Sequence, residues 1–194
     1  MEEDRLGNNV RAIVIGGSAG SLDVLFKLLP KLRNDIKQAI IIVLHRRRAN
    51  DSLLTDLLST KNCLPVREAE DKEPILPGHI YVAPSDYHLL VERNFTFSLD
   101  YSEKVNYSRP SLDVTFESAA DAYKHTLVGV LLSGANEDGT KGLKKVKMDG
   151  GIVIVQDPDT AQMPFMPTNA INNVSVDFVF STTEIATYIN LLGP

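Results

Sequence analysis

Residues 10–29, VRAIVIGGSAGSLDVLFKLL, decide the fold class of this chain. The stretch opens with a β-branched run at 10–15, which predicts a short strand that stops at Gly16 and Gly17. Leucines then recur at helical spacing, at positions 22, 25, 28 and 29. The order predicted is therefore strand, tight turn and helix.

The same unit returns along the chain. Residues 39–44, AIIIVL, are apolar on both faces, as a buried parallel strand is, and Asp51 is a candidate N-cap for a helix over 53–59. Beyond residue 110 the pattern predicts helices at 111–124, 138–149, 167–172 and 183–192, alternating with strands at 126–132, 151–155 and 177–181. This alternation predicts a parallel sheet covered by helices on both faces, with right-handed crossovers.

The middle of the chain has a different pattern. Prolines punctuate residues 65–84, and residues 89–99, LLVERNFTFSL, have two strand-like arms around Arg93 and Asn94, which predicts a hairpin. No linker, repeat or low-complexity segment divides the chain. We therefore expect a single domain over 1–194 with its core at about 11–190, built as a three-layer α/β fold. Its sheet is mostly parallel and doubly wound, with an antiparallel β-hairpin.

Composition excludes several classes of function. The chain has 194 residues, with 20 Lys and Arg against 25 Asp and Glu, so its net charge of −5 offers no overall positive field for nucleic acid or an anionic membrane. No apolar run approaches the ~20 residues that span a bilayer, and we expect a cytoplasmic protein without membrane insertion. The one cysteine, Cys63, cannot form an internal disulfide and is expected to be an inert core thiol.

Reactive side chains follow three of the predicted strands. In such folds ligands bind at the carboxyl ends of the strands, where Ser18, His45 and Asp138 fall. A serine hydroxyl needs a nearby base to act as a nucleophile, a neutral imidazole is such a base, and a carboxylate fixes the imidazole tautomer. The backbone N–H of Ala19 is a candidate oxyanion donor. The three groups together predict acyl transfer.

Other interpretations of these residues remain open. A glycine-rich turn after a first strand is also typical of dinucleotide loops, although this turn lacks the G-x-G-x-x-G pattern. An aspartate before a helix is often only an N-cap. The competing candidates are His88 for the base and Asp86, Asp113 and Glu137 for the carboxylate. Arg46, with the two arginines after it, is either a solvated face or a group that steers an acidic substrate.

Several motifs together resemble one family. In chain order they are IVIGGSAGSLDVL, VLH, ILPGHIYVAPSDYHLLV, VNYSRPSLDVTFESAA, GVLLSGANEDGTKGL and VQDPDTAQMPFMPTNAI. They resemble the catalytic domain of CheB, the chemotaxis protein-glutamate methylesterase. The resemblance implies hydrolysis of glutamyl methyl esters on the helical cytoplasmic region of chemoreceptors, and deamidation of receptor glutamines. It also implies Ser18 as nucleophile, His45 as base and Asp138 as orienting carboxylate, with no cofactor or metal.

The chain departs from the family pattern at several points. About ten residues precede the first strand, so we expect a stand-alone domain without the phosphoacceptor receiver domain of the family. Ala135 and Asn136 stand where the family has Met-Gly near its oxyanion site, and a backbone donor at Ala135 survives that exchange because it needs no particular side chain. Ser21 replaces a common glycine. Two alternative functions stay open: a catalytically silent signalling adaptor of the same fold, and a nucleotide-binding Rossmann-like module.

Overall fold

The structure is a computed structural model that describes residues 9–45, 51–61 and 63–192. Its main sheet has seven strands in the order β3-β4-β2-β1-β7-β8-β9, and every neighbouring pair is parallel. The strands are β1 (Ala12–Gly17), β2 (Ala39–Leu44), β3 (Val66–Glu68), β4 (Ile80–Val82), β7 (Leu127–Leu131), β8 (Ile152–Gln156) and β9 (Phe178–Phe180). A separate antiparallel hairpin joins β5 (His88–Val91) to β6 (Phe97–Asp100). The predicted fold class is confirmed.

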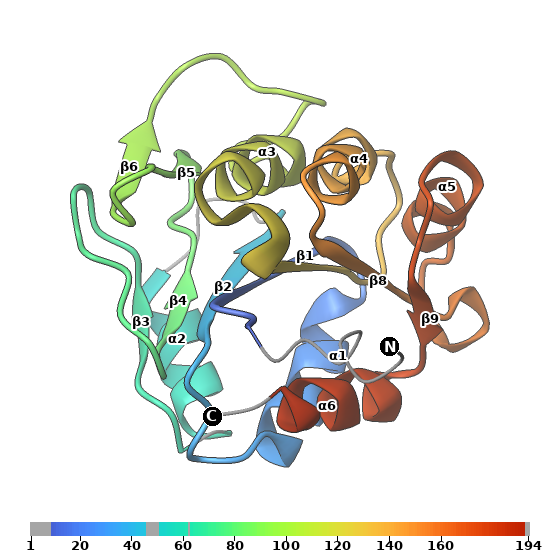
Figure 1. Cartoon of the computed structure of the whole chain (residues 1–194), viewed down its shortest axis with the longest axis horizontal. Helices are drawn as coiled ribbons and strands as arrows, with labels where there is room; N and C mark the ends of the chain where they lie inside the picture. Colours follow the sequence, from blue (N-terminus) through green and yellow to red (C-terminus); the bar gives the residue numbers. More distant parts are fainter. Residues whose placement is uncertain (1–8, 46–50, 62, 193–194) are drawn as a thin grey trace.

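Helices cover both faces of the sheet, which gives three layers (Figure 1). One face carries α1 (Ser21–Leu28), α2 (Asp51–Ser59) and α6 (Thr182–Leu191), and the other carries α3 (Leu112–Tyr123), α4 (Thr140–Met148) and α5 (Phe165–Asn173). Short 3₁₀ helices lie at Leu29–Lys31, Lys124–Thr126 and Pro158–Thr160. Within the described residues, no helix combines the length and apolar character that a bilayer crossing requires.

The two central strands explain why the sequence forms this sheet. In β1, Ala12 and Val14 pack on the α3 side, whereas Ile13 and Ile15 pack on the α1 side, and all four are fully buried. Strand β2 alternates in the same way over the predicted range 39–44. Burial on both faces requires apolar residues at every position, which is why these runs show no polar alternation.

Several sequence-based expectations were wrong in detail. Strand β1 continues through Gly16 and Gly17, because they pair with Val43 and Leu44 of β2. Glycine is required at position 16, where a Cβ would lie 3.0 Å from the Phe116 ring. Strands β3 and β4 were not predicted, since three residues each are too few to show a period. Cys63 is exposed and is not a core thiol.

The chain changes direction in the sheet at β1. Strands β2, β4 and β3 lie in that order on one side of β1, with β3 at the edge. The later strands β7, β8 and β9 lie on the other side of β1. The crevice between β1 and β7 is therefore the topological switch point, where ligands bind in open α/β sheets. Ser18 follows β1 at this point, and the loop 133–139 follows β7.

Candidate active site

Ser18 lies in the short connection between β1 and α1. Its carbonyl oxygen accepts hydrogen bonds from both the backbone N–H and the hydroxyl of Ser21, and its own N–H donates to the Ser133 carbonyl over 2.9 Å. Its hydroxyl makes no hydrogen bond to any described residue. The backbone of the half-buried Ser18 is thus fixed from two sides, while its hydroxyl stays available.

Gly20 is the residue on which this turn depends. Its φ of +82° is left-handed, and a Cβ there would lie 2.7 Å from the Gln162 side chain and 2.8 Å from the Ser133 hydroxyl. We expect Gly20→Ala to cost more than about 1 kcal/mol of unfolding free energy and to displace Ser18, because alanine meets both the backbone penalty and the clash. Urea unfolding and ester-hydrolysis rates measure the two effects.

Gly150→Ala is the matched control for this prediction. Gly150 has nearly the same φ, +85°, but a Cβ there would meet only His125, at 3.4 Å. Gly150→Ala should therefore show the backbone penalty alone and keep the wild-type rate. Equal effects of the two substitutions on stability and rate would contradict the role given to Gly20.

His45 is the first residue after β2, next to Ser18 across the sheet. Gly17 pairs with Leu44 in the β1–β2 ladder, and the His45 N–H donates to the Gly17 carbonyl over 3.1 Å. Ser18 and His45 therefore follow a paired position on strands about 5 Å apart. The His45 side chain is only 10% exposed, and its Nε2 lies 2.7 Å from Oδ2 of Asp138. His45 and Asp138 are thus in contact, and Ser18 follows the neighbouring strand at the same edge of the sheet.

Asp138 is fully buried and strongly hydrogen-bonded. Burial alone raises the pKa of its carboxyl, but hydrogen bonds from His45, Asn106 and the Leu112 N–H outweigh burial and lower the pKa to about 2. Asp138 is thus an ionised acceptor at neutral pH, so the bound Nε2 of His45 carries the proton. The lone pair is then on Nδ1, and the imidazole can accept a proton there.

Asp138 and Asp113 cap each other's helices. Asp138, which precedes α4, accepts from the N–H groups of Leu112 (2.7 Å) and Asp113 (3.1 Å) at the start of α3. Asp113, in the first turn of α3, accepts from the N–H groups of Gly139 (3.0 Å) and Gly142 (2.7 Å) at the start of α4. The exchange satisfies orphan donors of both helices and fixes the carboxylate that holds His45. Asp138 is therefore not the N-cap of its own helix; Gly139 takes that place.

Asn106 joins the two carboxylates and was missed from the sequence. Its Nδ2 donates over 2.8 Å to Oδ1 of Asp138 and over 2.8 Å to Oδ2 of Asp113. It sits in a tight turn closed by hydrogen bonds between Val105 and Ser108, with φ of +50° at Asn106 and +61° at Tyr107. Asparagine adopts this left-handed conformation more readily than most residues, which was the one available signal.

Burial raises the pKa of Asp113 to about 6, against the hydrogen bonds from Gly142 and Asn106, and the nearby charge of Asp138 adds to the rise. Since the unfolded pKa is about 4, the folded protein binds a proton between pH 4 and 6 that the unfolded chain does not. The contribution of Asp113 to stability therefore falls as pH rises through this window. Asp138 has a lowered pKa, so its contribution is present above about pH 4 and is lost as pH falls towards 2.

We expect Asp113→Asn to remove the fall in stability that Asp113 causes between pH 4 and 6. Urea unfolding at pH 4, 5, 6 and 7 measures the slope of the unfolding free energy against pH for both proteins. Asp159→Asn, at an exposed position, should keep the wild-type slope. A wild-type slope in Asp113→Asn would contradict the raised pKa.

The remaining candidates have distinct positions. Ala19 and Ala135 are both exposed at the switch point, and neither backbone N–H has an acceptor among the described residues. Arg46 lies outside the described residues. His88 is fixed away from this role, because its Nδ1 accepts from the Ser111 N–H and its Nε2 contacts the Glu103 carbonyl over 2.9 Å. Glu137 is exposed.

Side chains outside the candidate set hold the loop after β7. The Ser133 N–H donates to Oε1 of Gln156 over 2.9 Å, and the Ser133 hydroxyl donates to the Ala19 carbonyl over 2.7 Å. The Met163 N–H in turn donates to that hydroxyl. Ser133 thereby ties the Ser18 turn, β8 and the 157–164 segment together. Nothing in the spacing of these residues pointed to this link.

Two cavities border this region. One of about 410 Å³ is lined by Asn106, Asp113, Glu137 and residues of α4 and α5, and one of about 380 Å³ by Met163, Pro164, Phe165 and residues of α5. Asn169 lines both. Neither Ser18, His45 nor Asp138 lines either of them.

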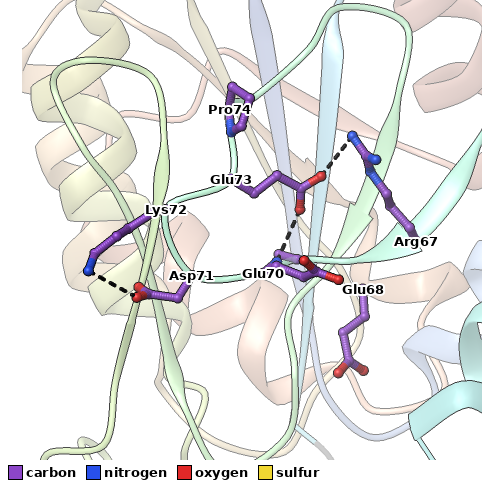
Figure 2. A pocket seen from close by; sticks show the side chains of 8 residues that line it. Arg67, Glu68, Glu70, Asp71, Lys72, Glu73 and Pro74 are labelled. Atoms are coloured by element: carbon purple, nitrogen blue, oxygen red, sulfur yellow. Dashed lines mark hydrogen bonds and ion pairs between the residues drawn. The ribbon is translucent and has the colours of Figure 1, made fainter.

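A third cavity, of about 490 Å³, lies beyond β3 and is lined by residues 67–74. Figure 2 shows ion pairs among its side chains: Arg67 contacts Glu73 over 2.7 Å, and Lys72 lies 3.8 Å from Asp71. Glu73 also accepts a hydrogen bond from the Glu70 N–H. None of the candidate residues lines this cavity. We assign it no part in the site.

Known proteins share both the sequence and the arrangement. The family model described as CheB methylesterase matches residues 13–189. A relative from Leptospira interrogans is 47% identical over 178 residues, which cover 92% of each chain. A Thermotoga maritima protein-glutamate methylesterase/protein-glutamine glutaminase is 38% identical over 90% of this chain and 52% of its own length. The crystal structure of the Thermotoga maritima CheB methylesterase catalytic domain matches with a TM-score of 0.90 at 35% identity, over 95% of this chain and 99% of that domain.

Proposed function

Because the chain belongs to the CheB methylesterase family, a family of hydrolases, we propose that it removes methyl groups from glutamate methyl esters of chemoreceptors. The observation that carries the proposal is the 2.7 Å contact between His45 Nε2 and Asp138, beside Ser18 at the switch point. We place the reaction in the cytoplasm, at the helical signalling region of the receptor.

In the first half-reaction, the Ser18 hydroxyl gives its proton to Nδ1 of His45 as its oxygen attacks the ester carbonyl carbon. The ionised Asp138 stabilises the imidazolium that forms. The N–H groups of Ala19 and Ala135 are the donors we assign to the developing oxyanion, and one such donor is worth about 3 kcal/mol. When the intermediate collapses, the carbon–oxygen bond to the methoxy group breaks and His45 returns the proton to form methanol.

In the second half-reaction, water attacks the glutamyl ester of Ser18. His45 Nδ1 takes a proton from the water and then gives it to the departing Ser18 oxygen, which releases the glutamate carboxylate. A glutamine side chain follows the same course with ammonia as leaving group. Deamidation therefore needs no additional residue.

The proposal is tested by methanol release from purified, methylated chemoreceptor fragments. The rate of methanol release should rise in proportion to the concentration of the wild-type protein, and a fluorophosphonate probe should label Ser18. A folded protein that neither releases methanol nor takes the probe would be the silent adaptor instead. Saturable micromolar binding of a reduced dinucleotide would favour the nucleotide-binding alternative. One observation speaks against nucleotide binding: the Ser18 N–H already donates to the Ser133 carbonyl, so it is not available to bind the phosphate of a nucleotide.

A further inference from the structure

The side chain of Asn136 is aimed at the base. Its Oδ1 accepts from the Asp138 N–H over 3.2 Å, and this donor fixes which end of the amide is oxygen. The other end, Nδ2, then lies 3.5 Å from Nδ1 of His45. Asn136 is half-buried and lies in the loop that also carries Asp138. A glycine, the residue of the family pattern at this position, could make neither contact.

Asn136 and Ser18 compete for one lone pair. Nε2 of His45 is bound to the ionised Asp138, so Nδ1 is the acceptor nitrogen of the ring. In the proposed reaction that same Nδ1 receives the Ser18 proton. At 3.5 Å the bond from Asn136 is at the upper limit for a hydrogen bond, so it is easily exchanged for the Ser18 hydroxyl.

We propose that Asn136 is a positioning residue that holds resting His45 as the neutral, Nε2-protonated tautomer by donating to Nδ1. A donor at that nitrogen stabilises the neutral ring, since an imidazolium would place N–H against N–H. Only the neutral ring can accept this contact at Nδ1. Asp138 contacts the ring directly, and Asn106 links Asp138 to the carboxylate of Asp113. The inference rests on the proposed function only for its effect on rate.

The test is an NMR titration of the His45 ring in the wild type, Asn136→Gly and Asn136→Asp, with the resonance assigned by His45→Gln. The His45 midpoint should rise by about half a pH unit in Asn136→Gly, which loses the donor. It should rise by more than about one unit in Asn136→Asp, where a carboxylate faces Nδ1. Glu137→Gly, which loosens the same loop without a contact to His45, should keep the wild-type midpoint. An unchanged or lowered midpoint in Asn136→Gly would overturn the inference.

Rates report on the proposed function separately. The fall of kcat/KM for a small activated ester at low pH should follow the His45 midpoint measured by NMR. At pH values well below that midpoint, kcat/KM of Asn136→Gly should therefore be about threefold lower than that of the wild type, whereas at pH 8 the two values should be equal. If the NMR midpoints shift as expected while no variant and no wild-type protein hydrolyses esters, the Asn136 contact stands and the esterase assignment fails.

Discussion

Ser18→Ala is expected to lower kcat/KM for ester hydrolysis by about 10⁴-fold or more. Alanine removes the only atom that forms the acyl intermediate in the proposed reaction, and the residual rate then comes from the oxyanion donors and substrate binding. The substitution should leave the fold intact, because the Ser18 hydroxyl makes no hydrogen bond to the described residues. Methanol release and hydrolysis of a small ester measure the loss.

Ser175→Ala is the matched control, because it makes the same substitution at an exposed serine between α5 and β9. It should keep the wild-type rate. Unchanged unfolding of Ser18→Ala in urea separates a chemical loss from a structural one. Ester hydrolysis at the wild-type rate by Ser18→Ala would remove Ser18 from the mechanism.

Asp138→Asn is expected to have two effects: it should lower kcat/KM for ester hydrolysis by about 10⁴-fold, and it should destabilise the fold. An amide has one accepting oxygen, whereas the carboxylate of Asp138 accepts hydrogen bonds on both oxygens. In one orientation, the NH₂ group of the asparagine would face the N–H groups of His45 and Leu112. In the other orientation, it would face the donors of Asn106 and Ser111. The first arrangement favours the wrong tautomer of His45, which accounts for the loss of rate. Either arrangement leaves buried donors unpaired, which costs about 1–3 kcal/mol of unfolding free energy.

Urea unfolding at pH 7 and kcat/KM measure the two effects of Asp138→Asn. Asp159→Asn, an exposed aspartate outside the network, should change neither. A loss of activity without any loss of stability would show that Asp138 does not hold the start of α3. Full activity would show that it does not orient His45.

The sequence predicted the elements whose own residues form a long enough pattern. Strand β2 matches its predicted range because six consecutive apolar residues require a two-sided core. Strands β3 and β4 could not be predicted, because β4 pairs with β2 and β3 with β4, and neither strand has a period of its own. Helix α4 begins at Thr140 and not at 138, because Asp138 turns away to α3 and His45.

The candidate site was predictable only in part, for a similar reason. Ser18, His45 and Asp138 follow strands, so the rule on strand ends brought them together. Asn106 comes from an irregular turn whose place over Asp138 is set by tertiary packing, and no local pattern encodes that. The sequence also could not pair Asp113 with α4, because reciprocal capping is visible only once α3 and α4 lie side by side.

The most direct test of the account is the double variant Ser18→Ala/His45→Ala compared with each single variant. Groups that act as one unit lose their whole contribution when any one is removed. We therefore predict that kcat/KM for ester hydrolysis in the double variant equals that of Ser18→Ala within a few-fold. A double variant slower by the product of the two single effects, or a single variant at the wild-type rate, would contradict a joint role for Ser18 and His45.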